Sequence, residues 1–292
     1  MFQDVAKSRH LVGVAITLTM TGSDENGEPA DPGTVTVAVT NSVGASVTSG
    51  AVAVSSNDRS TTIAAADNAA VDRLTAVWSS GGAVLATTYH DVVGGFYASL
   101  ADIRSNTTLG SATKHPDATL LEVRSEVEYQ LDDACRRAFV PRFASETLSG
   151  SGRNVLQLAQ GDLREVVSLE YWTGTAWADL AVTVAEIEPD SFGRAVMRRD
   201  VFPAGHKNLR VGYRYGLDRP PADLKRAVVK AVEARRAGDT SGIPSRAISV
   251  QGTELGNVVL ATPGLGKWIT AIPEIDEVIN RYRRRDLGVG IS

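Results

Sequence analysis

The stretch DATLLEVRSEVEYQLDDACRRA, residues 117–138, predicts a long amphipathic helix in the middle of the chain. Asp117 can cap its first turn, and apolar side chains follow every three or four positions. These apolar positions are Leu120, Val123, Val127, Leu131, Ala134 and Ala138. The charged residues, among them Arg124 and Glu128, fall largely off this stripe. A helix with one apolar face must bury it, so we expect other helices or neighbouring subunits to cover this face.

A second segment with helical period runs from Pro221 to Ala237. Pro221 suits the first helical turn, and Gly238 is a residue that commonly ends a helix. The apolar stripe of this segment consists of Leu224, Ala227, Val228, Ala231 and Val232.

A third helix is expected from Glu274 to about Asp286, with Pro273 before it. Its apolar stripe is Ile275, Val278, Ile279 and Tyr282, and its last turn holds the arginines Arg281, Arg283, Arg284 and Arg285. A helix of about three turns is marginally stable on its own. We therefore expect this helix to dock on a partner protein and to add little to the fold of the single subunit.

From Leu11 to about Val93 the pattern is that of half-buried strands. Apolar side chains alternate with small or polar ones at residues 12–20 and 34–40, and further strands are expected at residues 51–55, 74–78 and 83–89. Ser80, Gly81 and Gly82 suit a hairpin turn between the last two. Several short strands without helical period predict a small antiparallel sandwich of immunoglobulin-like type.

Between the first two helices, residues 146–216 return to strand character. We expect short strands at residues 155–158, 166–172, 181–187, 195–198 and 209–215. The stretch from 238 to 266 is rich in Gly, Ser, Thr and Pro and indicates an extended connector or arm.

The length of 292 residues favours at least two hydrophobic cores. The predicted fold class is α+β multidomain. An immunoglobulin-like β-sandwich at 1–95 is followed by a helical domain at 96–237 with an inserted antiparallel β domain at 146–216. An extended arm and the C-terminal helix occupy 238–292. Because the period changes after residue 93, we expect residues 96–292 to fold without the sandwich.

The histidines and the cysteine, which are candidates for catalysis or metal binding, do not form a catalytic pattern. The histidines His10, His90, His115 and His206 are isolated from one another in sequence and lack metal-ligand spacing. Cys135 has no second cysteine to pair with and lies inside a helical pattern, so we interpret it as a core thiol.

The segment ATPGLGKW, residues 261–268, lacks the glycine and the hydroxyl that a phosphate-binding loop needs at Ala261 and Trp268. Asp132 and Asp133 lie on adjacent helical positions and point about 100° apart. The run Glu186, Glu188 and Asp190 lacks the pattern of a calcium loop and indicates a solvated strand end. We expect no enzyme activity, cofactor or metal. Glycoside hydrolysis by two facing carboxylates stays open, because a sequence does not show which acids face each other.

Positive charge gathers toward the C-terminus, where residues 218–292 carry twelve basic and nine acidic groups against a net charge of −4 for the chain. The basic residues are Lys225, Arg226, Lys230, Arg235, Arg236 and the arginines of the third helix. They form either solvated helix faces or a surface for an acidic partner or DNA. The apolar stretch near the start is too short to span a membrane and no signal cleavage site follows it. We therefore expect neither secretion nor a membrane anchor.

Six segments in order resemble the head-to-tail adaptor, or connector, proteins of long-tailed bacteriophages. They are GGFYASLADIR (94–104), KHPD (114–117), DDACRRAFVPR (132–142), NLRVGYRYG (208–216), PPADL (220–224) and IPEIDEVINRY (272–282). The resemblance covers roughly residues 96–286. The N-terminal β domain resembles additions on adaptors of phages that infect actinobacteria.

The resemblance implies a structural virion protein of the neck, at the head–tail interface, made in the host cytoplasm. It implies a homo-oligomeric ring of twelve copies that binds the portal protein on one side and a stopper or tail-completion protein on the other. Double-stranded DNA would pass through the lumen without sequence readout, and no membrane is involved. The ring-body helices would use Leu120, Val123, Val127, Leu131, Leu224, Val228 and Val232. The C-terminal stripe and its four arginines would dock on the portal.

Two alternatives remain at this stage. A stopper or tail-completion protein belongs to the same neck but is usually shorter and more purely β. An extracellular β-sandwich adhesin or carbohydrate-binding protein would explain the Thr/Val/Gly-rich first domain and would bind glycans through exposed aromatic residues.

Overall fold

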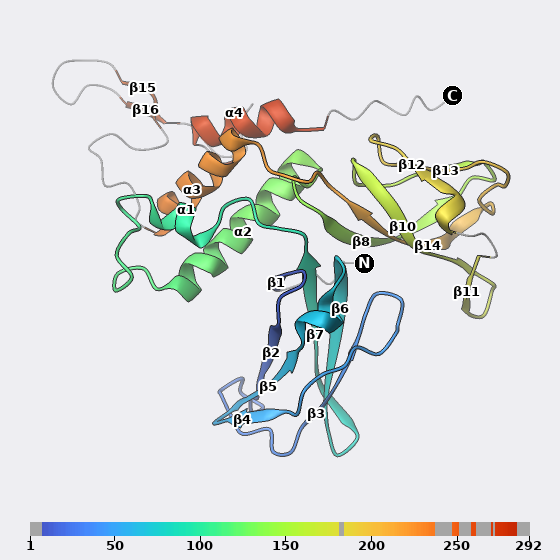
Figure 1. The fold of residues 1–292 in the computed structure, drawn as a ribbon, viewed down its shortest axis with the longest axis horizontal. Helices are drawn as coiled ribbons and strands as arrows, with labels where there is room; N and C mark the ends of the chain where they lie inside the picture. The colour runs from blue at the N-terminus through green and yellow to red at the C-terminus, as the bar shows by residue number, and fades with distance from the viewer. Residues whose placement is uncertain are drawn as a thin grey trace. The chain divides into compact units, whose positions relative to one another are not determined.

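The computed structural model describes residues 8–180, 184–236, 270 and 272–284, and the backbone of 247–250 and 258–260. The described chain is mixed α+β, with most of its elements being strands in several sheets (Figure 1). It forms two compact units. Residues 1–95, 141–158 and 162–216 make up the β unit, and residues 96–140, 159–161 and 217–292 make up the helical unit.

The first part of the β unit has two sheets that share one core (Figure 1). One sheet has the order β1 (Ser8–Leu11), β7 (Ala83–Val93), β6 (Asp72–Ser80) and β3 (Thr36–Thr40). The other has the order β2 (Ile16–Thr21), β5 (Asp58–Ile63) and β4 (Ala53–Ser55), and a short 3-10 helix, η1 (Ala65–Asn68), follows β5. Leu18 and Ile63 from one sheet and Trp78 from the other are fully buried in that core. The alternation in the sequence therefore does mark the buried face.

Three details of this region differ from the prediction. The alternating run from 11 to 20 is not one strand, because the chain leaves one sheet after Leu11 and enters the other at Ile16. β5 lies in a stretch where no strand was expected, since polar residues such as Asp58 and Ser60 hid its period. β1 pairs with β7 in parallel, so the sandwich is not purely antiparallel.

The second part of the β unit contains a sheet with the order β11 (Trp177–Asp179), β10 (Leu163–Trp172), β14 (Gly205–Tyr215) and β8 (Arg142–Gly150). A smaller sheet has the order β12 (Ile187–Pro189), β13 (Arg194–Met197) and β9 (Val155–Gln157). The strands expected at 155–158, 166–172, 195–198 and 209–215 are confirmed. Of the strand expected at 181–187, residues 181–183 lie outside the described residues, and Val184–Glu186 form a 3-10 helix, η2.

Hydrogen bonds join the first part of the β unit to the second. The Gly94 N–H donates to the Pro141 carbonyl at 2.9 Å, the Arg142 guanidinium donates to the Gly95 carbonyl at 2.9 Å, and Arg214 Nε donates to the Val71 carbonyl at 2.6 Å. A side chain at Gly94 would collide with Pro141, since a Cβ there would lie 2.7 Å from that ring. The close approach at this glycine holds the end of β7 against the start of β8.

The helical unit consists of α1 (Leu100–Arg104), α2 (Asp117–Cys135), α3 (Ala222–Arg236) and α4 (Pro273–Tyr282), together with the two-stranded pair β15 (Ala247–Val250) and β16 (Val258–Leu260). The pair β15–β16 lies in the expected connector, most of which falls outside the described residues. Asp117 does not cap α2, since Pro116 holds the N-cap position and Asp117 forms an ion pair with Arg104. The four helices share one hydrophobic core, so the helices cover one another's apolar faces.

The polar side of α2 is not all exposed, contrary to the expectation for Arg124 and Glu128. The Glu128 carboxylate is fully buried and accepts a hydrogen bond from the Tyr97 N–H at 2.7 Å. Arg124 is buried too, donates to the Ala98 carbonyl at 3.2 Å and lies 3.6 Å from the centre of the Phe96 ring. Tyr97 donates from its hydroxyl to Asp132. Positions 124, 128 and 132 form one face of the helix, and this face binds residues 96–98.

We expect Glu128→Ala to lower the free energy of unfolding by about 1–3 kcal/mol, because it leaves a buried backbone donor without its acceptor. Urea denaturation followed by circular dichroism measures the change. Glu122→Ala on the exposed side of the same helix is the matched control and should change stability by less than about 0.5 kcal/mol. Equal effects of the two substitutions would show that the buried carboxylate does not hold the segment.

Candidate functional site

The apolar stripe of α4 lies in the core of the helical unit. Ile275 and Ile279 are each 1% exposed, and Val278 is 8% exposed. All three pack in the same cluster as Leu224, Val228 and Val232 of α3. The expectation that this helix adds little to the fold of the subunit is therefore wrong, because the subunit itself supplies the apolar surface that the stripe needs.

Tyr282 at the end of α4 contacts two other parts of the helical unit. Its ring packs edge-on against Phe139, with 5.4 Å between the centroids. Its hydroxyl donates to the Asp223 carboxylate at 3.0 Å, and Arg281 reaches the same carboxylate at 2.7 Å. Burial is the largest cause of the raised pKa of Tyr282, and the hydrogen bond to Asp223 is the next. These contacts fix the last turn of α4 against the start of α3.

The arginines that follow α4 meet the end of α2. The helix stops at Tyr282, earlier than predicted, because Arg283 has an extended backbone. The Arg284 N–H donates to the Cys135 carbonyl at 2.9 Å, and its guanidinium lies 3.4 Å from the Ala159 carbonyl. Arg285 lies outside the described residues.

Two more arginines lie at the C-terminal end of α2, next to Cys135. Arg136 ends the helix in the left-handed conformation with φ 51°, and Arg137 follows it. Arg137 and Arg283 both lie near enough to the Cys135 thiol to act on its pKa. We call Arg136, Arg137, Arg283 and Arg284 the arginine cluster. Arg136 and Arg137 were not among the basic residues expected to form a surface, although a pair of cations at a helix C-terminus, where the macrodipole favours positive charge, can be recognised in the sequence.

The arginine cluster can bind anionic groups. A guanidinium offers a planar fork of donors that matches a carboxylate or a phosphate. Arg136 and Arg283 are exposed. Carboxylates of a protein surface and phosphates of DNA both fit this chemistry.

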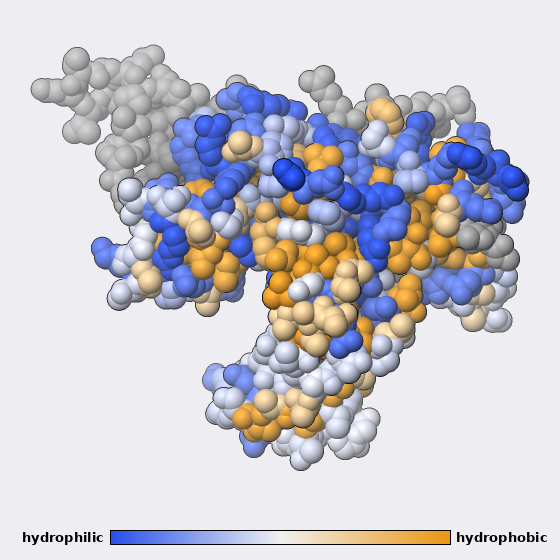
Figure 2. Space-filling model, viewed as in Figure 1, coloured by the Kyte–Doolittle hydropathy of each residue, from blue (hydrophilic) through white to orange (hydrophobic). Residues whose placement is uncertain are grey.

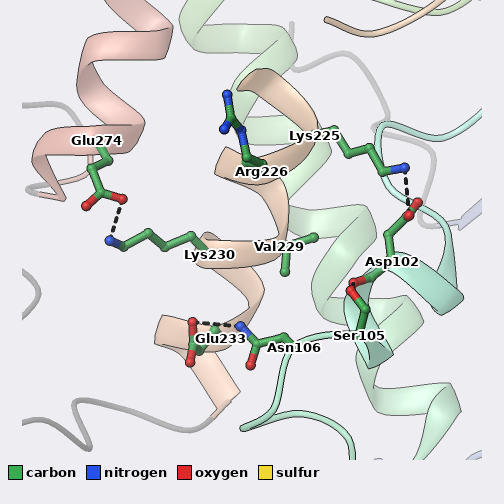
Figure 3. Close-up of a pocket in the computed structure, with 9 residues that line it drawn as sticks. All are labelled: Asp102, Ser105, Asn106, Lys225, Arg226, Val229, Lys230, Glu233 and Glu274. Carbon is green, nitrogen blue, oxygen red and sulfur yellow. Dashed lines mark hydrogen bonds and ion pairs between the residues drawn. The ribbon is translucent and has the colours of Figure 1, made fainter. Parts of the chain in front are cut away.

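The basic residues of α3 are mostly neutralised inside the helical unit. A hollow of about 450 Å³ is lined by α1, α3 and the start of α4 (Figure 3). In it the Lys225 ammonium binds Asp102 at 2.6 Å and lowers the pKa of that carboxyl to about 2, and Lys230 binds Glu274 at 2.5 Å. Elsewhere on α3, Arg235 binds Glu126 at 3.1 Å.

Arg226 differs from its neighbours on α3. It lines the same hollow, is exposed, and forms no ion pair with any residue that the structure describes (Figure 3). The visible surface over α3 and α4 is mainly hydrophilic (Figure 2). Most of this basic face therefore consists of solvated ion pairs, and Arg226 remains as an exposed cation.

The predicted ring-body residues lie inside the subunit. Leu120, Val127, Leu131, Leu224, Val228 and Val232 are between 0% and 2% exposed, and Val123 is partly buried against the same cluster. Their side chains therefore hold the helices of one subunit together. A contact between subunits has to use other side chains of these helices.

The candidate catalytic and metal-binding residues lie in ordinary structural surroundings. Cys135 is buried, as expected. The pKa of its thiol is raised to about 12, and burial is the largest cause of this shift. Glu188 binds Arg198, which directly follows β13, and Asp190 binds Arg194, the first residue of β13. No group of three or more His, Cys, Asp or Glu that could hold a metal occurs among the described residues.

Two of the histidines are not isolated in space. His10 and His90 have ring centroids 5.4 Å apart, although they lie 80 positions apart in the sequence. The parallel pairing of β1 with β7 brings them together, and a short strand with this pairing has no distinct sequence signal. The segment 261–268 lies outside the described residues.

Comparison with known proteins gives likenesses in solved structures. No family model matches the chain, and no curated protein matches it. The neck of an empty gene transfer agent (GTA) particle computed with C6 symmetry has a TM-score of 0.44 at 16% identity, over 66% of this chain and 92% of that chain. The virion of the native GTA particle has a TM-score of 0.42 at 16% identity, over 66% and 92%. The neck of the native GTA particle computed with C12 symmetry has a TM-score of 0.40 at 16% identity, over 68% and 98%.

All three TM-scores lie below 0.5, so the function proposed below is based on the residues of the chain itself. Among the described helices, none is both long and apolar enough to cross a membrane.

We expect Ile279→Ala to lower the free energy of unfolding by about 2–5 kcal/mol, because it opens a cavity in the core of the helical unit. Thermal or urea denaturation measures the loss. Arg283→Ala, four residues further and exposed, should leave stability within about 0.5 kcal/mol of the wild type. A small effect of Ile279→Ala would return α4 to the role of a loosely attached docking helix.

We also expect Cys135 to resist thiol reagents in the native protein, since the pKa of about 12 leaves almost no thiolate at pH 8 and the side chain is buried. Labelling with Ellman's reagent should follow unfolding, with a rate that rises steeply across the urea transition. The chain has one cysteine, so the signal has a single source. Fast labelling without denaturant would contradict a core thiol.

Proposed function

We propose that this chain is a structural protein of the neck of a tailed-phage-like particle. In this proposal it is a head-to-tail adaptor that forms a ring of twelve copies between the portal and a stopper or tail-completion protein. Double-stranded DNA passes through the lumen without sequence readout. The protein is made in the host cytoplasm and ends in the virion, and its role is structural and not enzymatic.

The observation that carries the proposal is that the segments with adaptor-like sequence meet around Phe139. The Phe139 N–H donates to the Tyr97 hydroxyl at 3.0 Å, and the two rings pack edge-on at 5.6 Å. Tyr282 also packs edge-on against Phe139, and it binds Asp223. Four of the six segments, 94–104, 132–142, 220–224 and 272–282, thus build one core. A chance set of similar segments has no reason to converge.

The covered apolar faces constrain how a ring could form. A cyclic ring joins two different patches of each subunit head to tail. The helical core is closed within the subunit, so the ring contacts that we propose use outer, largely polar surfaces of α2 and α3 or the edges of the sheets. Contacts of this kind depend on salt more than a hydrophobic interface does.

We place the docking surface for the portal at the arginine cluster and not at the α4 stripe. The stripe is occupied by the subunit's own core, whereas Arg136 and Arg283 are exposed. Clustered guanidinium groups attract an acidic protein surface and speed its association. The position of four arginines at the joined C-terminal ends of α2 and α4 supports this assignment.

The two alternatives differ in their support. A stopper or tail-completion protein of the same neck would share the ring and the partner chemistry. A glycan-binding sandwich needs exposed aromatic side chains on the first two sheets. Trp78 is fully buried there, and nothing in the described part of that sandwich offers another tryptophan.

The oligomeric state of the purified protein tests the ring, and mixing it with the portal protein of the same particle tests the partner. We expect mass photometry or negative-stain microscopy to show closed rings, alone or after mixing with the portal, and the two proteins to co-purify. Monomers under all conditions, without binding to the portal, would overturn the proposal.

A charge reversal tests the docking surface separately. Arg136→Glu with Arg283→Glu should weaken portal association by at least about tenfold at low salt, with a smaller difference at high salt, since exposed charges are screened. Arg226→Glu on α3 is the matched control, being exposed and unpaired among the described residues. Equal loss in both variants would place the docking surface elsewhere.

A further inference from the structure

β1 is a short strand at the edge of the first sheet of the β unit. Its four residues pair in parallel with β7, in the register Ser8 with His90 and His10 with Val92. After Leu11 the chain crosses to the other sheet, where β2 begins at Ile16. β1 is therefore an edge strand beside β7, and Asn68 of η1 also holds its end by donating to the Leu11 carbonyl at 3.0 Å.

Side chains add a second attachment between these strands. Ser8 Oγ lies 2.6 Å from His90 Nδ1 and 3.0 Å from His10 Nε2, and the two imidazole nitrogens are 3.3 Å apart. On its other side, His90 Nε2 lies 2.9 Å from the Thr88 hydroxyl, which accepts from Trp78 Nε1 at 3.2 Å. A chain of contacts thus runs from β1 through β7 to the buried tryptophan of β6.

This chain of contacts suits two neutral imidazoles. With the proton of His90 on Nε2, that nitrogen donates to Thr88 and Nδ1 accepts from the Ser8 hydroxyl. Ser8 Oγ in turn accepts from His10 Nε2. His10, Ser8, His90 and Trp78 then each donate once, Thr88 accepts from His90 and Trp78, and no two N–H groups face each other. A proton added to His90 Nδ1 would point at the Ser8 hydroxyl and at the N–H of His10 Nε2, so the Ser8 hydroxyl would have to turn its own proton away and accept from both rings.

The surroundings favour the neutral forms. His90 is 7% exposed. Burial is the largest cause that lowers the pKa of His90 to about 4, and the nearby His10 lowers it further. Burial also lowers the pKa of His10.

Asp91 is the charged group that acts against this effect. Its carboxylate raises the pKa of both histidines, but Arg73 of β6 binds it at 2.8 Å and partly neutralises it. Arg9 of β1 is paired with Asp91 in the strand register and brings another positive charge. The charged side chains on β1, β6 and β7 are thus Arg9, Arg73, Asp72 and Asp91, and of these Asp91 is the one that raises the pKa of the two histidines.

We propose that Ser8, His10 and His90 form an acid-released clasp, in which protonation of the histidine pair detaches β1 from β7. Two imidazolium groups with nitrogens 3.3 Å apart repel each other, and a proton on His90 Nδ1 removes the hydrogen bond that the Ser8 hydroxyl donates to that nitrogen. Release of β1 leaves backbone groups of β7 unpaired at the sheet edge, where another strand can pair. The clasp is independent of the function proposed above.

The sign of the pH dependence follows from the lowered pKa values. Above about pH 6.5 the histidines are neutral whether β1 is attached or free, so the clasp keeps its full stability. As the pH falls below 6.5, the free state takes up protons first, and the attached state loses stability until the pH approaches 4, the pKa of His90 in the clasp. The strand should therefore open between pH 6.5 and pH 4.

Hydrogen exchange of the full-length protein, with labelling times corrected for the intrinsic effect of pH, measures the opening. We expect protection of residues 8–12 to fall about tenfold or more between pH 7.5 and pH 5, while β6 and β14 keep theirs. Val12, whose N–H donates to the Val93 carbonyl at 3.0 Å, gives a local probe.

Three variants separate the clasp from general acid sensitivity. His10→Gln removes the repulsion between the imidazoles and should reduce the pH effect, and His10→Gln with His90→Gln should abolish it. His206→Gln, an exposed histidine on β14, should leave the effect as in the wild type. Unchanged protection of residues 8–12 in the wild type at pH 5 would overturn the proposal, as would an equal loss in the double variant. Should the double variant fail to fold, His10→Gln alone decides, because a full pH effect without the pair contradicts the clasp.

Discussion

A buried carboxylate needs a partner, and Glu128 finds it in the backbone N–H of Tyr97. This requirement fixes the path of the chain where it enters the helical unit. Once residues 96–98 lie along α2, the Tyr97 hydroxyl reaches Asp132 and accepts from the Phe139 N–H. Phe139 in turn gives Tyr282 a ring to pack against. The entry of the chain, the end of α2 and the end of α4 are therefore parts of one packing arrangement.

The same arrangement determines what is left for partners. Because α2, α3 and α4 bury their apolar stripes in one another, these stripes are not free to bind a partner. Most lysines and arginines of α3 form ion pairs with α1, α2 and α4. Exposed pairs of this kind add little stability each. Their effect is to neutralise the basic face. The arginine cluster is different, since four cations from two distant segments meet at two helix C-termini.

Periodicity in the sequence predicted the existence and type of the main elements, because a stripe of apolar residues every three or four positions leaves few alternatives to a helix. Periodicity did not predict whether a residue is buried where its contact partner lies far away in the sequence. Nothing within α2 marks Glu128 as buried, since its partner Tyr97 lies 31 positions earlier. The stripe of α4 could be recognised, but whether its own subunit or another protein covers it depends on α3. The strand β5 was missed because its outward residues are polar and its inward ones include Thr61 and Arg59, both 2% exposed.

Neither the histidine pair nor the arginine cluster could be predicted from the sequence. Both are made by segments far apart in sequence, and each member alone has an ordinary structural explanation. The parallel register of β1 with β7 creates the first, and the contact of the Arg284 N–H with the Cys135 carbonyl creates the second. Charge acts oppositely in the two places. In the buried pair, added positive charge opposes the contact, because desolvation and like charge both penalise it. In the arginine cluster, where Arg136 and Arg283 are exposed, water and the helix dipoles offset the repulsion among the arginines.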